Sequence, residues 1–138
     1  MSLFQVVYAS QPSRHDEATL NGILADARRR NVEDDITGAL ICRADIYLQL
    51  LEGPISKVKA AYTRINRDDR HHSIRELVFD PAGSRLFPGW AMRDDPARSW
   101  LWTPRQIAEG ALERASRADI LAVFKRIADD PFRTDRPR

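Results

Sequence analysis

The segment Ile46–Leu51, with the sequence IYLQLL, constrains the fold of this chain more than any other feature. It is apolar at every position except Gln49, whereas a strand with one face in solvent alternates apolar and polar residues. A strand that is apolar on both sides needs a covering layer on each face. The chain has 138 residues, enough for one domain with one hydrophobic core. The segment therefore predicts the central strand of a single sheet that is covered on both faces.

Five strands and two helices are predicted in the first 92 residues. The strands are predicted at Leu3–Ser10, Ile36–Cys42, Ile46–Leu51, Glu76–Phe79 and Trp90–Met92. The first helix follows a capping signal at Ser13 and Asp16 and ends near Asn31, and the second starts at Ser56 and ends in residues 68–72. The order βαββαββ is that of a ferredoxin-like α+β fold with one added strand. Both helices then cover one face of an antiparallel sheet, with the first and third strands adjacent at its centre.

Two further helices are predicted in the C-terminal part of the chain. One starts at the capping box Thr103–Gln106 and ends near Gly110, and the other is capped by Ser116. The apolar positions of the second helix are Ile120, Leu121, Phe124 and Ile127. We expect these helices to pack on the free face of the sheet. The predicted organisation is a domain at residues 1–93, a helical extension at residues 94–130 and a flexible tail at residues 131–138.

Composition argues against several classes of protein. The chain carries 22 Lys and Arg against 20 Asp and Glu, and the excess positive charge lies in residues 131–138. Nucleic-acid binders carry a basic stripe on their folded part, so no nucleic acid is expected. No apolar run approaches the roughly 20 residues that span a membrane, and the N-terminus does not resemble a signal peptide. With Cys42 as the single cysteine, these features predict a cytoplasmic protein that does not bind membranes.

The sequence shows no motif for catalysis or metal binding. The histidines His15, His71 and His72 do not have the spacing of a metal site. Gly-rich phosphate loops are absent, and no Ser-His-Asp or Cys-His grouping stands out. We therefore expect neither a bound metal ion nor an enzyme.

Gln49, Tyr8 and Asn31 are polar residues at positions that need an explanation. Leaving the amide of a buried Gln49 unpaired costs about 1–3 kcal/mol, so we expect it to have polar partners from the backbone or a side chain. Tyr8, near the end of the first strand, either shares a face with Gln49 and bonds to it or turns its hydroxyl to solvent. Asn31, at the predicted end of the first helix, has the ordinary interpretation of a C-cap residue.

Charged residues gather where the two helices end. Arg30 lies next to Asn31, and the second helix ends among Arg64, Asp68, Arg70 and His71. Such residues commonly form a solvent-exposed face with ion pairs. The alternative is a polar rim around a ligand that lies between the two helices. The residues alone leave both interpretations open.

Several segments together resemble the BLUF domains, which sense blue light using FAD. The matching segments are Val6–Ser10, Asn31 with Ile36–Gly38, Leu48–Gly53, Ile65–Asp68, Arg70–His71 and Arg85–Met92. They occur in order over roughly residues 1–93, and they are more specific together than any one of them is alone. The resemblance implies that FAD is the cofactor and that residues 1–93 form the flavin-binding sensor domain.

The resemblance implies a photoactive group of residues. Tyr8 would give an electron to the excited flavin, and Gln49 would bridge Tyr8 and the flavin edge. Gln49 would then rearrange, strengthen a hydrogen bond to the flavin and shift its absorption to the red. Trp90 or Met92 would lie near Gln49 and pass its change to the last strand.

The resemblance also implies a set of cofactor-binding residues. They would be Asn31, Arg30, Gln49, Arg64, Asp68, Arg70 and His71. Asn31 would anchor one edge of the flavin ring, and the residues at the end of the second helix would line or support its rim.

A sensor of this short type would turn over no substrate. The chain is expected to end too soon after Met92 for a second enzymatic domain, so output would pass to a separate signalling protein or through a homodimer. Trp100, Trp102 and the face with Phe124 either contact a partner or pack against the sheet. Two other classes stay open: a redox flavoprotein that is not photoactive, and an adaptor that has lost FAD.

Overall fold

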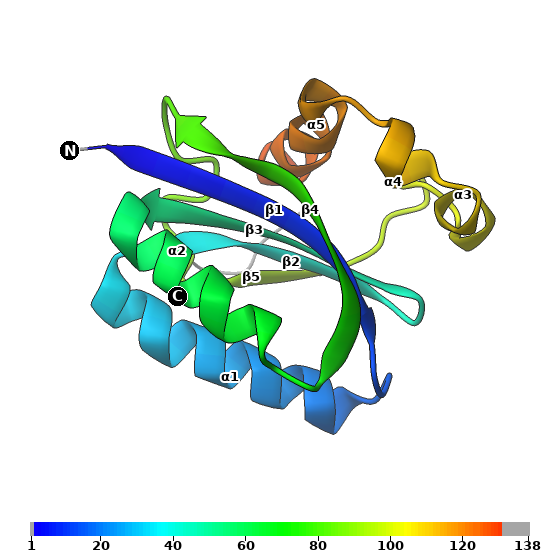
Figure 1. Ribbon diagram of the computed structural model, residues 1–138, viewed down its shortest axis with the longest axis horizontal. Helices are drawn as coiled ribbons and strands as arrows, with labels where there is room; N and C mark the ends of the chain where they lie inside the picture. The colour runs from blue at the N-terminus through cyan, green and yellow to red at the C-terminus, as the bar shows by residue number, and fades with distance from the viewer. Residues whose placement is uncertain (1, 131–138) are drawn as a thin grey trace.

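The computed structural model describes residues 2–130, which form one mixed five-stranded sheet with helices on both faces (Figure 1). The strands are β1 (Leu3–Pro12), β2 (Thr37–Arg43), β3 (Ile46–Pro54), β4 (His71–Ala82) and β5 (Arg93–Pro96). The helices are α1 (Glu17–Asp34), α2 (Ile55–Asn66), α3 (Pro104–Ala108), α4 (Ala111–Arg114) and α5 (Arg117–Ala128). The strand order is β4-β1-β3-β2-β5, so β1 and β3 lie together at the centre as predicted. The ferredoxin-like α+β fold is confirmed.

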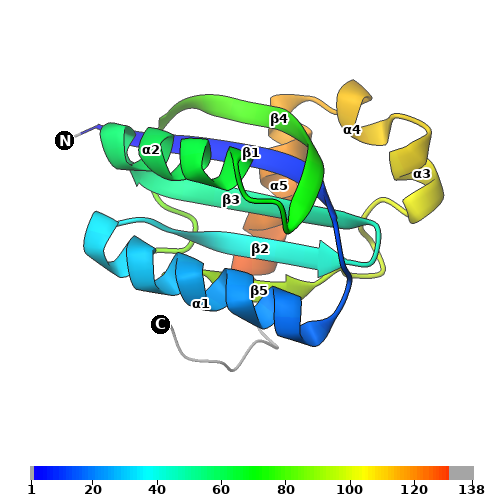
Figure 2. The ribbon, with the colours of Figure 1, turned by 60° about the horizontal axis from the view of Figure 1, so that its bottom comes forward.

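The sheet separates two hydrophobic clusters. Helices α1 and α2 cover one face, and α5 crosses the other (Figure 2). Successive residues of β1 point to opposite sides, so Val6 packs toward α1 and α2 while Val7 packs toward α5. Phe124 of α5 is fully buried, and Trp100 and Trp102 pack against the same cluster. The Phe124 face therefore packs on the sheet, which is one of the two roles expected for it.

The predicted end of the first helix was wrong by one turn. The helix begins at the N-cap Asp16, whose carboxylate accepts a hydrogen bond from the Thr19 amide at 2.7 Å. It continues past Asn31 and ends at Asp35, which adopts a left-handed conformation with φ of 57°. The Asp35 amide closes the helix by bonding the carbonyl of Asn31. The Asn31 side chain is thus released from capping and is buried in the interior.

Other boundaries also differ from the sequence prediction, and α2 ends at Asn66 rather than within residues 68–72. Residues 90–92 are not a strand, because the Trp90 amide bonds the Phe87 carbonyl at 3.1 Å in a tight turn, and β5 begins only at Arg93. This last strand pairs with β2 in parallel, whereas the other three pairs are antiparallel. Strand β4 is longer than predicted because it pairs with β1 along most of its length. A third C-terminal helix, α4, follows a left-handed Gly110 with φ of 93°.

The predicted tail, residues 131–138, lies outside the described residues. Among residues 2–130, no helix combines the length and apolar character needed to cross a membrane.

Replacing Gly38 by Ala tests the close approach of β2 to β3. A Cβ atom at this position would lie 1.9 Å from the backbone oxygen of Leu50, which cannot move without disrupting the sheet. We expect Gly38→Ala to lower the free energy of unfolding by about 1–3 kcal/mol or more, measured by urea denaturation. Gly83→Ala is the matched control, since its Cβ would meet no atom within 4 Å. Equal effects of the two variants would contradict this packing.

Candidate functional site

A cavity of about 250 Å³ lies between α1, α2 and the face of the sheet that these two helices cover. Helix α1 contributes Ile23 and Ala27 to its walls, and α2 contributes Ala61 and Ile65. The two alanines are short, so the facing helices leave space between them. The base of the cavity is the sheet itself, including Leu51 of β3. The result is an apolar slot of the kind that holds a flat ring system.

Tyr8 and Gln49 form the polar part of the inner wall. They are direct partners in the register of β1 and β3, which places both side chains on the same face of the sheet. The Tyr8 hydroxyl donates a short hydrogen bond to Oε1 of Gln49, and both residues are buried. This confirms the predicted contact and answers the need of Gln49 for a side-chain partner.

Met92 holds the other end of the Gln49 amide. The Nε2 group of Gln49 donates to the sulfur of Met92 at 3.3 Å, and Met92 is fully buried. The oxygen of the amide therefore faces Tyr8, and its nitrogen faces the residue immediately before β5. Exchanging the two ends of the amide would alter both contacts without moving the backbone.

Trp90 lies on the opposite side of the sheet from this group. It belongs to the hydrophobic cluster under α5 and is stacked by the guanidinium group of Arg93, 5.6 Å from its ring centre. Its backbone carbonyl accepts a hydrogen bond from the Gly38 amide at 3.1 Å. Of the two residues predicted to lie near Gln49, the structure places Met92 there.

Burial raises the pKa of the Tyr8 hydroxyl far above its ordinary value of 10.0. The negative charge of Asp68 adds to this effect, with smaller contributions from Tyr62 and Tyr47. Tyr8 is thus a neutral phenol over the whole physiological range. Its proton is held in the hydrogen bond to Gln49.

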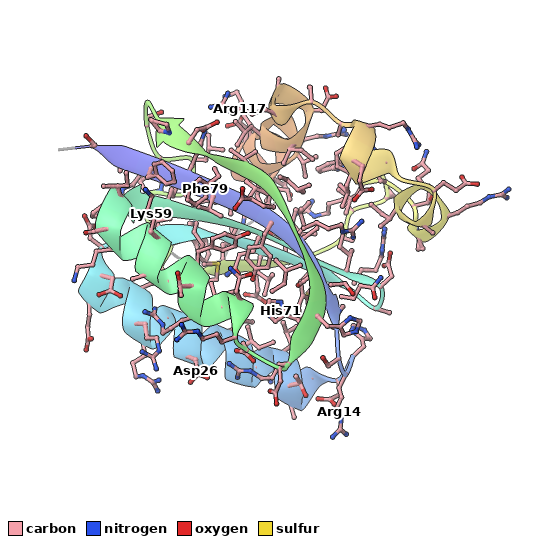
Figure 3. All side chains as sticks on the ribbon, in the orientation of Figure 1. Arg14, Asp26, Lys59, His71, Phe79 and Arg117 are labelled. Atoms are coloured by element: carbon pink, nitrogen blue, oxygen red, sulfur yellow. The ribbon has the colours of Figure 1, made fainter. Side chains whose placement is uncertain are left out.

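His71 packs edge-on against the Tyr8 ring, with 5.8 Å between ring centres. It comes from the start of β4, just beyond the end of α2, and is labelled in Figure 3. Its Nε2 lies 2.7 Å from the carbonyl of Ile65, which can only accept, so Nε2 carries a hydrogen. Its Nδ1 lies 2.6 Å from the hydroxyl of Ser10. Both ring nitrogens are engaged, which fixes the ring that supports Tyr8.

Asn31 is buried at another side of the cavity. Its Nδ2 donates to the carbonyl of Ala91 at 2.7 Å. The neighbouring Arg28 donates from Nε to the Met92 carbonyl at 3.1 Å and pairs with Asp94 at 2.9 Å. Helix α1 therefore holds the chain on both sides of Met92.

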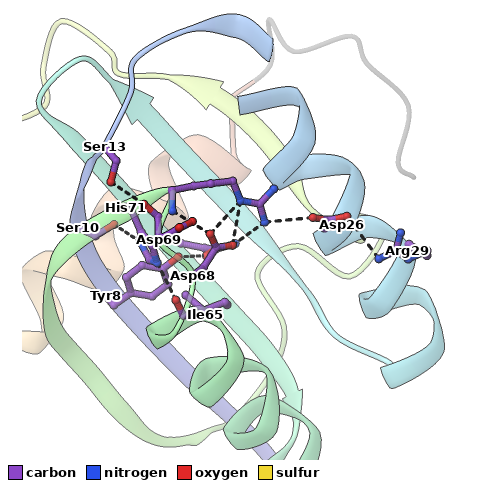
Figure 4. A network of polar contacts seen from close by, with 11 residues as sticks. Tyr8, Ser10, Ser13, Asp26, Arg29, Ile65, Asp68, Asp69 and His71 are labelled. Atoms are coloured by element: carbon purple, nitrogen blue, oxygen red, sulfur yellow. Dashed lines mark hydrogen bonds and ion pairs between the residues drawn. The ribbon is translucent and has the colours of Figure 1, made fainter. Parts of the chain in front are cut away.

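Arg70 connects the segment after α2 to the middle of α1. Its guanidinium group bonds both carboxylate oxygens of Asp68 and pairs with Asp26 of α1 at 3.1 Å, as the contacts in Figure 4 show. The hydrogen bonds from Arg70 lower the pKa of Asp68 below its ordinary value of 3.8. This network supports the cavity wall, because its donors and acceptors are used within the protein.

Cationic groups also line the cavity. Arg30, Arg64 and Arg67 are all among the lining residues. Arg64 approaches Asp34 at 4.0 Å, whereas Arg30 and Arg67 form no ion pair within residues 2–130. Positive charges without a protein partner beside an apolar slot suit an anionic ligand.

The sequence interpretation missed several lining residues, notably Asp26, Arg67 and Tyr47. Asp26 was detectable, because it lies three residues after Ile23 and four before Arg30 and so shares a side of α1 with them. Among residues 2–130 there is also no group of three or more His, Cys, Asp or Glu arranged to hold a metal ion.

Comparison with known proteins identifies the class. The family described as "BLUF: Sensors of blue-light using FAD" matches residues 3–93. The blue light- and temperature-regulated antirepressor BluF of Escherichia coli (strain K12) is 39% identical over 87 residues, 62% of this chain and 21% of that protein. The photoactivated adenylate cyclase subunit beta of Euglena gracilis is 33% identical over 93 residues, 66% of this chain and 11% of that protein. The chain thus spans about a fifth and a tenth of these relatives.

Solved structures agree in fold. The dark-state structure of BlrB, a BLUF protein, has a TM-score of 0.75 and 27% identity, covering 92% of this chain and 96% of that one. The ground state of BlsA has a TM-score of 0.78 at 19% identity, covering 99% of this chain and 91% of that one, which shows the shared fold. The chain belongs to the BLUF family, whose members sense blue light using FAD.

The residues of the cavity fit FAD. The slot between Ala27 and Ala61 suits a flat ring, and the buried amides of Asn31 and Gln49 provide hydrogen-bonding groups at its inner side. The lining guanidinium groups suit phosphates.

Replacing Arg70 by Gln tests the network between the helices. Because the folded-state pKa of Asp68 lies below its unfolded value, its charge stabilises the fold above about pH 4, and this contribution fades as the pH falls through the folded-state pKa. In Arg70→Gln we expect the pKa of Asp68 to rise toward 3.8 and acid unfolding to begin at higher pH. Carboxyl-carbon NMR and circular dichroism measure these effects.

Arg105→Gln is the control for loss of a positive charge, because Arg105 is exposed on α3 and pairs with Glu109 at 3.5 Å, outside this network. It should leave the Asp68 titration unchanged. An unaltered Asp68 pKa in Arg70→Gln would contradict the network.

Proposed function

We propose that this chain is a photoreceptor module in which Tyr8 and Gln49 are the photoactive pair and Met92 is the first residue to respond. The observation that carries the proposal is the buried chain of contacts from the Tyr8 hydroxyl through the Gln49 amide to the Met92 sulfur. It lies in the wall of the apolar cavity and ends one residue before β5. A ligand in the cavity could change the hydrogen bonds of this group, and the change would alter the position of Met92 next to the edge strand β5.

We propose that the cavity residues hold FAD in two ways. Asn31 and Gln49 would hydrogen-bond polar atoms of the ring, and Arg30, Arg64 and Arg67 would attract the phosphates. Asp68, Arg70 and His71 would support the site through contacts within the protein, as their hydrogen bonds to one another and to Ser10 and Ile65 suggest.

When bound, FAD supplies blue-light absorption and an excited state that accepts an electron. Tyr8 is the proposed donor, because it is buried in the cavity wall as a neutral phenol whose hydroxyl bonds Gln49. Its proton already points at Oε1 of Gln49, so loss of an electron from Tyr8 would release that proton toward the amide. Gln49 would then exchange donor and acceptor ends and present a donor where it had presented an acceptor. Its contact with Met92 would change in the same event.

We propose that output leaves through β5 and the helical extension at residues 94–130, beyond a sensor domain at residues 1–93. The named relatives include an antirepressor and a cyclase subunit, in which the matching segment is a small part of a larger protein. For this chain we propose a separate signalling protein as partner, or a homodimer, with no turnover of substrate and a cytoplasmic location.

Tyr8→Phe tests the photoactive pair. The variant keeps the ring and the burial but removes the hydroxyl that bonds Gln49, so we expect FAD to stay bound and the light-induced red shift to be lost. The measurement is the visible spectrum in the dark and directly after blue light. Tyr62→Phe is the matched control, since its ring lies 5.8 Å from that of Tyr8 and the control should keep the shift. A normal shift in Tyr8→Phe would contradict the proposal.

Gln49→Leu tests the amide separately. It removes both the acceptor for Tyr8 and the donor for Met92, and it should abolish the red shift while leaving a flavin spectrum. A wild-type protein that bleaches in light without a red shift would indicate a redox flavoprotein. Failure of the wild-type protein to bind FAD would indicate an adaptor.

A further inference from the structure

Glu52 is a buried carboxylate that the proposed photochemistry does not use. It lies on β3, three residues after Gln49, and only 2% of its surface is exposed. Burying a carboxylate is unfavourable unless donors replace its water. Here Oε1 accepts from the Leu86 amide and Oε2 accepts from the Phe87 amide, each at 2.8 Å. Oε2 also accepts from the Thr37 hydroxyl at 2.8 Å.

These bonds tie the segment 85–92 to the centre of the sheet. Arg85 strengthens the attachment by donating to the Thr37 hydroxyl at 2.8 Å and by pairing with Asp35 at 3.1 Å. From there the chain turns at Phe87 and Trp90 and reaches Met92. The carboxylate of Glu52 therefore holds the start of this segment. The end of the same segment places the Met92 sulfur against the Gln49 amide.

The opposite end of the segment is held from α1. Asn31 bonds the Ala91 carbonyl and Arg28 bonds the Met92 carbonyl. Residues 86–92 are thus fixed at both ends. At the first end the Glu52 carboxylate accepts hydrogen bonds from backbone amides, and at the second the side chains of Asn31 and Arg28 donate hydrogen bonds to backbone carbonyls. Met92 itself contributes a flexible side chain, whose position depends on its backbone.

We propose that Glu52 is a positioning residue for the photoactive group: its carboxylate holds the backbone at Leu86 and Phe87 so that the Met92 sulfur stays on Nε2 of Gln49. This inference rests on the proposed role of Gln49. It assigns to Glu52 control over the dark orientation of the Gln49 amide, exerted through Met92. Loosening the segment removes a contact to which the amide must return after illumination.

Glu52→Gln is the direct test, because it keeps the size of the side chain but turns one acceptor into a donor that faces a backbone amide or a hydroxyl. We expect thermal return to the dark spectrum to slow by at least about threefold, in line with the loss of one weak hydrogen bond. Glu33→Gln, at an exposed position of α1, is the control for loss of a carboxylate and should recover at the wild-type rate.

A second readout does not depend on the photocycle. The chain has two methionines, Met1 and Met92. Carbon-13 labelling of methionine methyl groups therefore yields at most two signals, of which one reports on Met92. In the dark, Glu52→Gln should shift that signal and Glu33→Gln should not. An unchanged signal together with unchanged recovery would overturn the proposal.

The coupling to Met92 separates positioning from general destabilisation. In a Met92→Ala background, Glu52→Gln should change recovery by less than about 1.5-fold, since the residue through which it acts is gone. An equal factor in both backgrounds would show that Glu52 acts by another route and would overturn the proposal. If the wild-type protein shows no red shift, the proposed function fails, and the methyl signal alone then decides the role of Glu52.

Thr37→Val replaces Glu52→Gln if the latter does not fold. It removes one of the three donors to Glu52 and leaves the charge in place, so the Met92 signal should move in the same direction by a smaller amount. Thr37→Ser, which restores a hydroxyl, should return the signal to the wild-type position. A Thr37→Val signal identical to wild type would overturn the proposal.

Discussion

The register between β1 and β3 is the constraint on which the site depends. It places Tyr8 directly opposite Gln49 on the two central strands, within the layer that faces α1 and α2. Because side chains alternate along a strand, a slip of one residue would send one of the pair to the other face of the sheet. The register is strongly determined, since both faces of both strands are buried. A slip of one residue would move the side chains that pack under α1 and α2 into the cluster under α5, and the reverse. The contact between Tyr8 and Gln49, proposed to be photoactive, thus follows from the same packing that stabilises the fold.

The sheet also divides the molecule into a cavity side and a side covered by the C-terminal helices. The segment that leads into β5 has residues on both sides, since Met92 contacts Gln49 while Arg93 stacks on Trp90 in the opposite cluster. Arg93 in turn lies 2.8 Å from Asp95, and both are almost completely buried. Under the proposed mechanism, a change in the Gln49 amide would reach the far layer within one residue along the chain. No long path through the core is needed.

The central elements were predictable because local pattern and tertiary environment agree there. The apolar run around Gln49 predicts a strand covered on both faces, and the pairing of its neighbours predicts that Tyr8 comes within reach. The end of the first helix was not predictable in the same way. Asn31 is a common capping residue, but its side chain is drawn inward by the Ala91 carbonyl, which is 60 residues away in sequence. The last strand carries the sequence RDDP, which has no strand pattern and becomes a strand only through pairing with β2.

The sequence by itself determined the order of the elements and the buried position of Gln49, and it placed Tyr8 on the neighbouring strand, because these depend on hydrophobic periodicity and on the topology it imposes. Its motifs also identified the family. Only the tertiary structure decided that Met92 rather than Trp90 lies on Gln49, that Arg70 joins the two helices, and that Glu52 anchors the segment before β5. Each of these contacts joins residues that are far apart in the sequence, and the contacts of Met92 and Glu52 depend on the path of the chain from the turn at Phe87–Trp90 into β5. The Pro88-Gly89 pair indicates a turn, but nothing in the sequence RDDP indicates a strand or its parallel pairing.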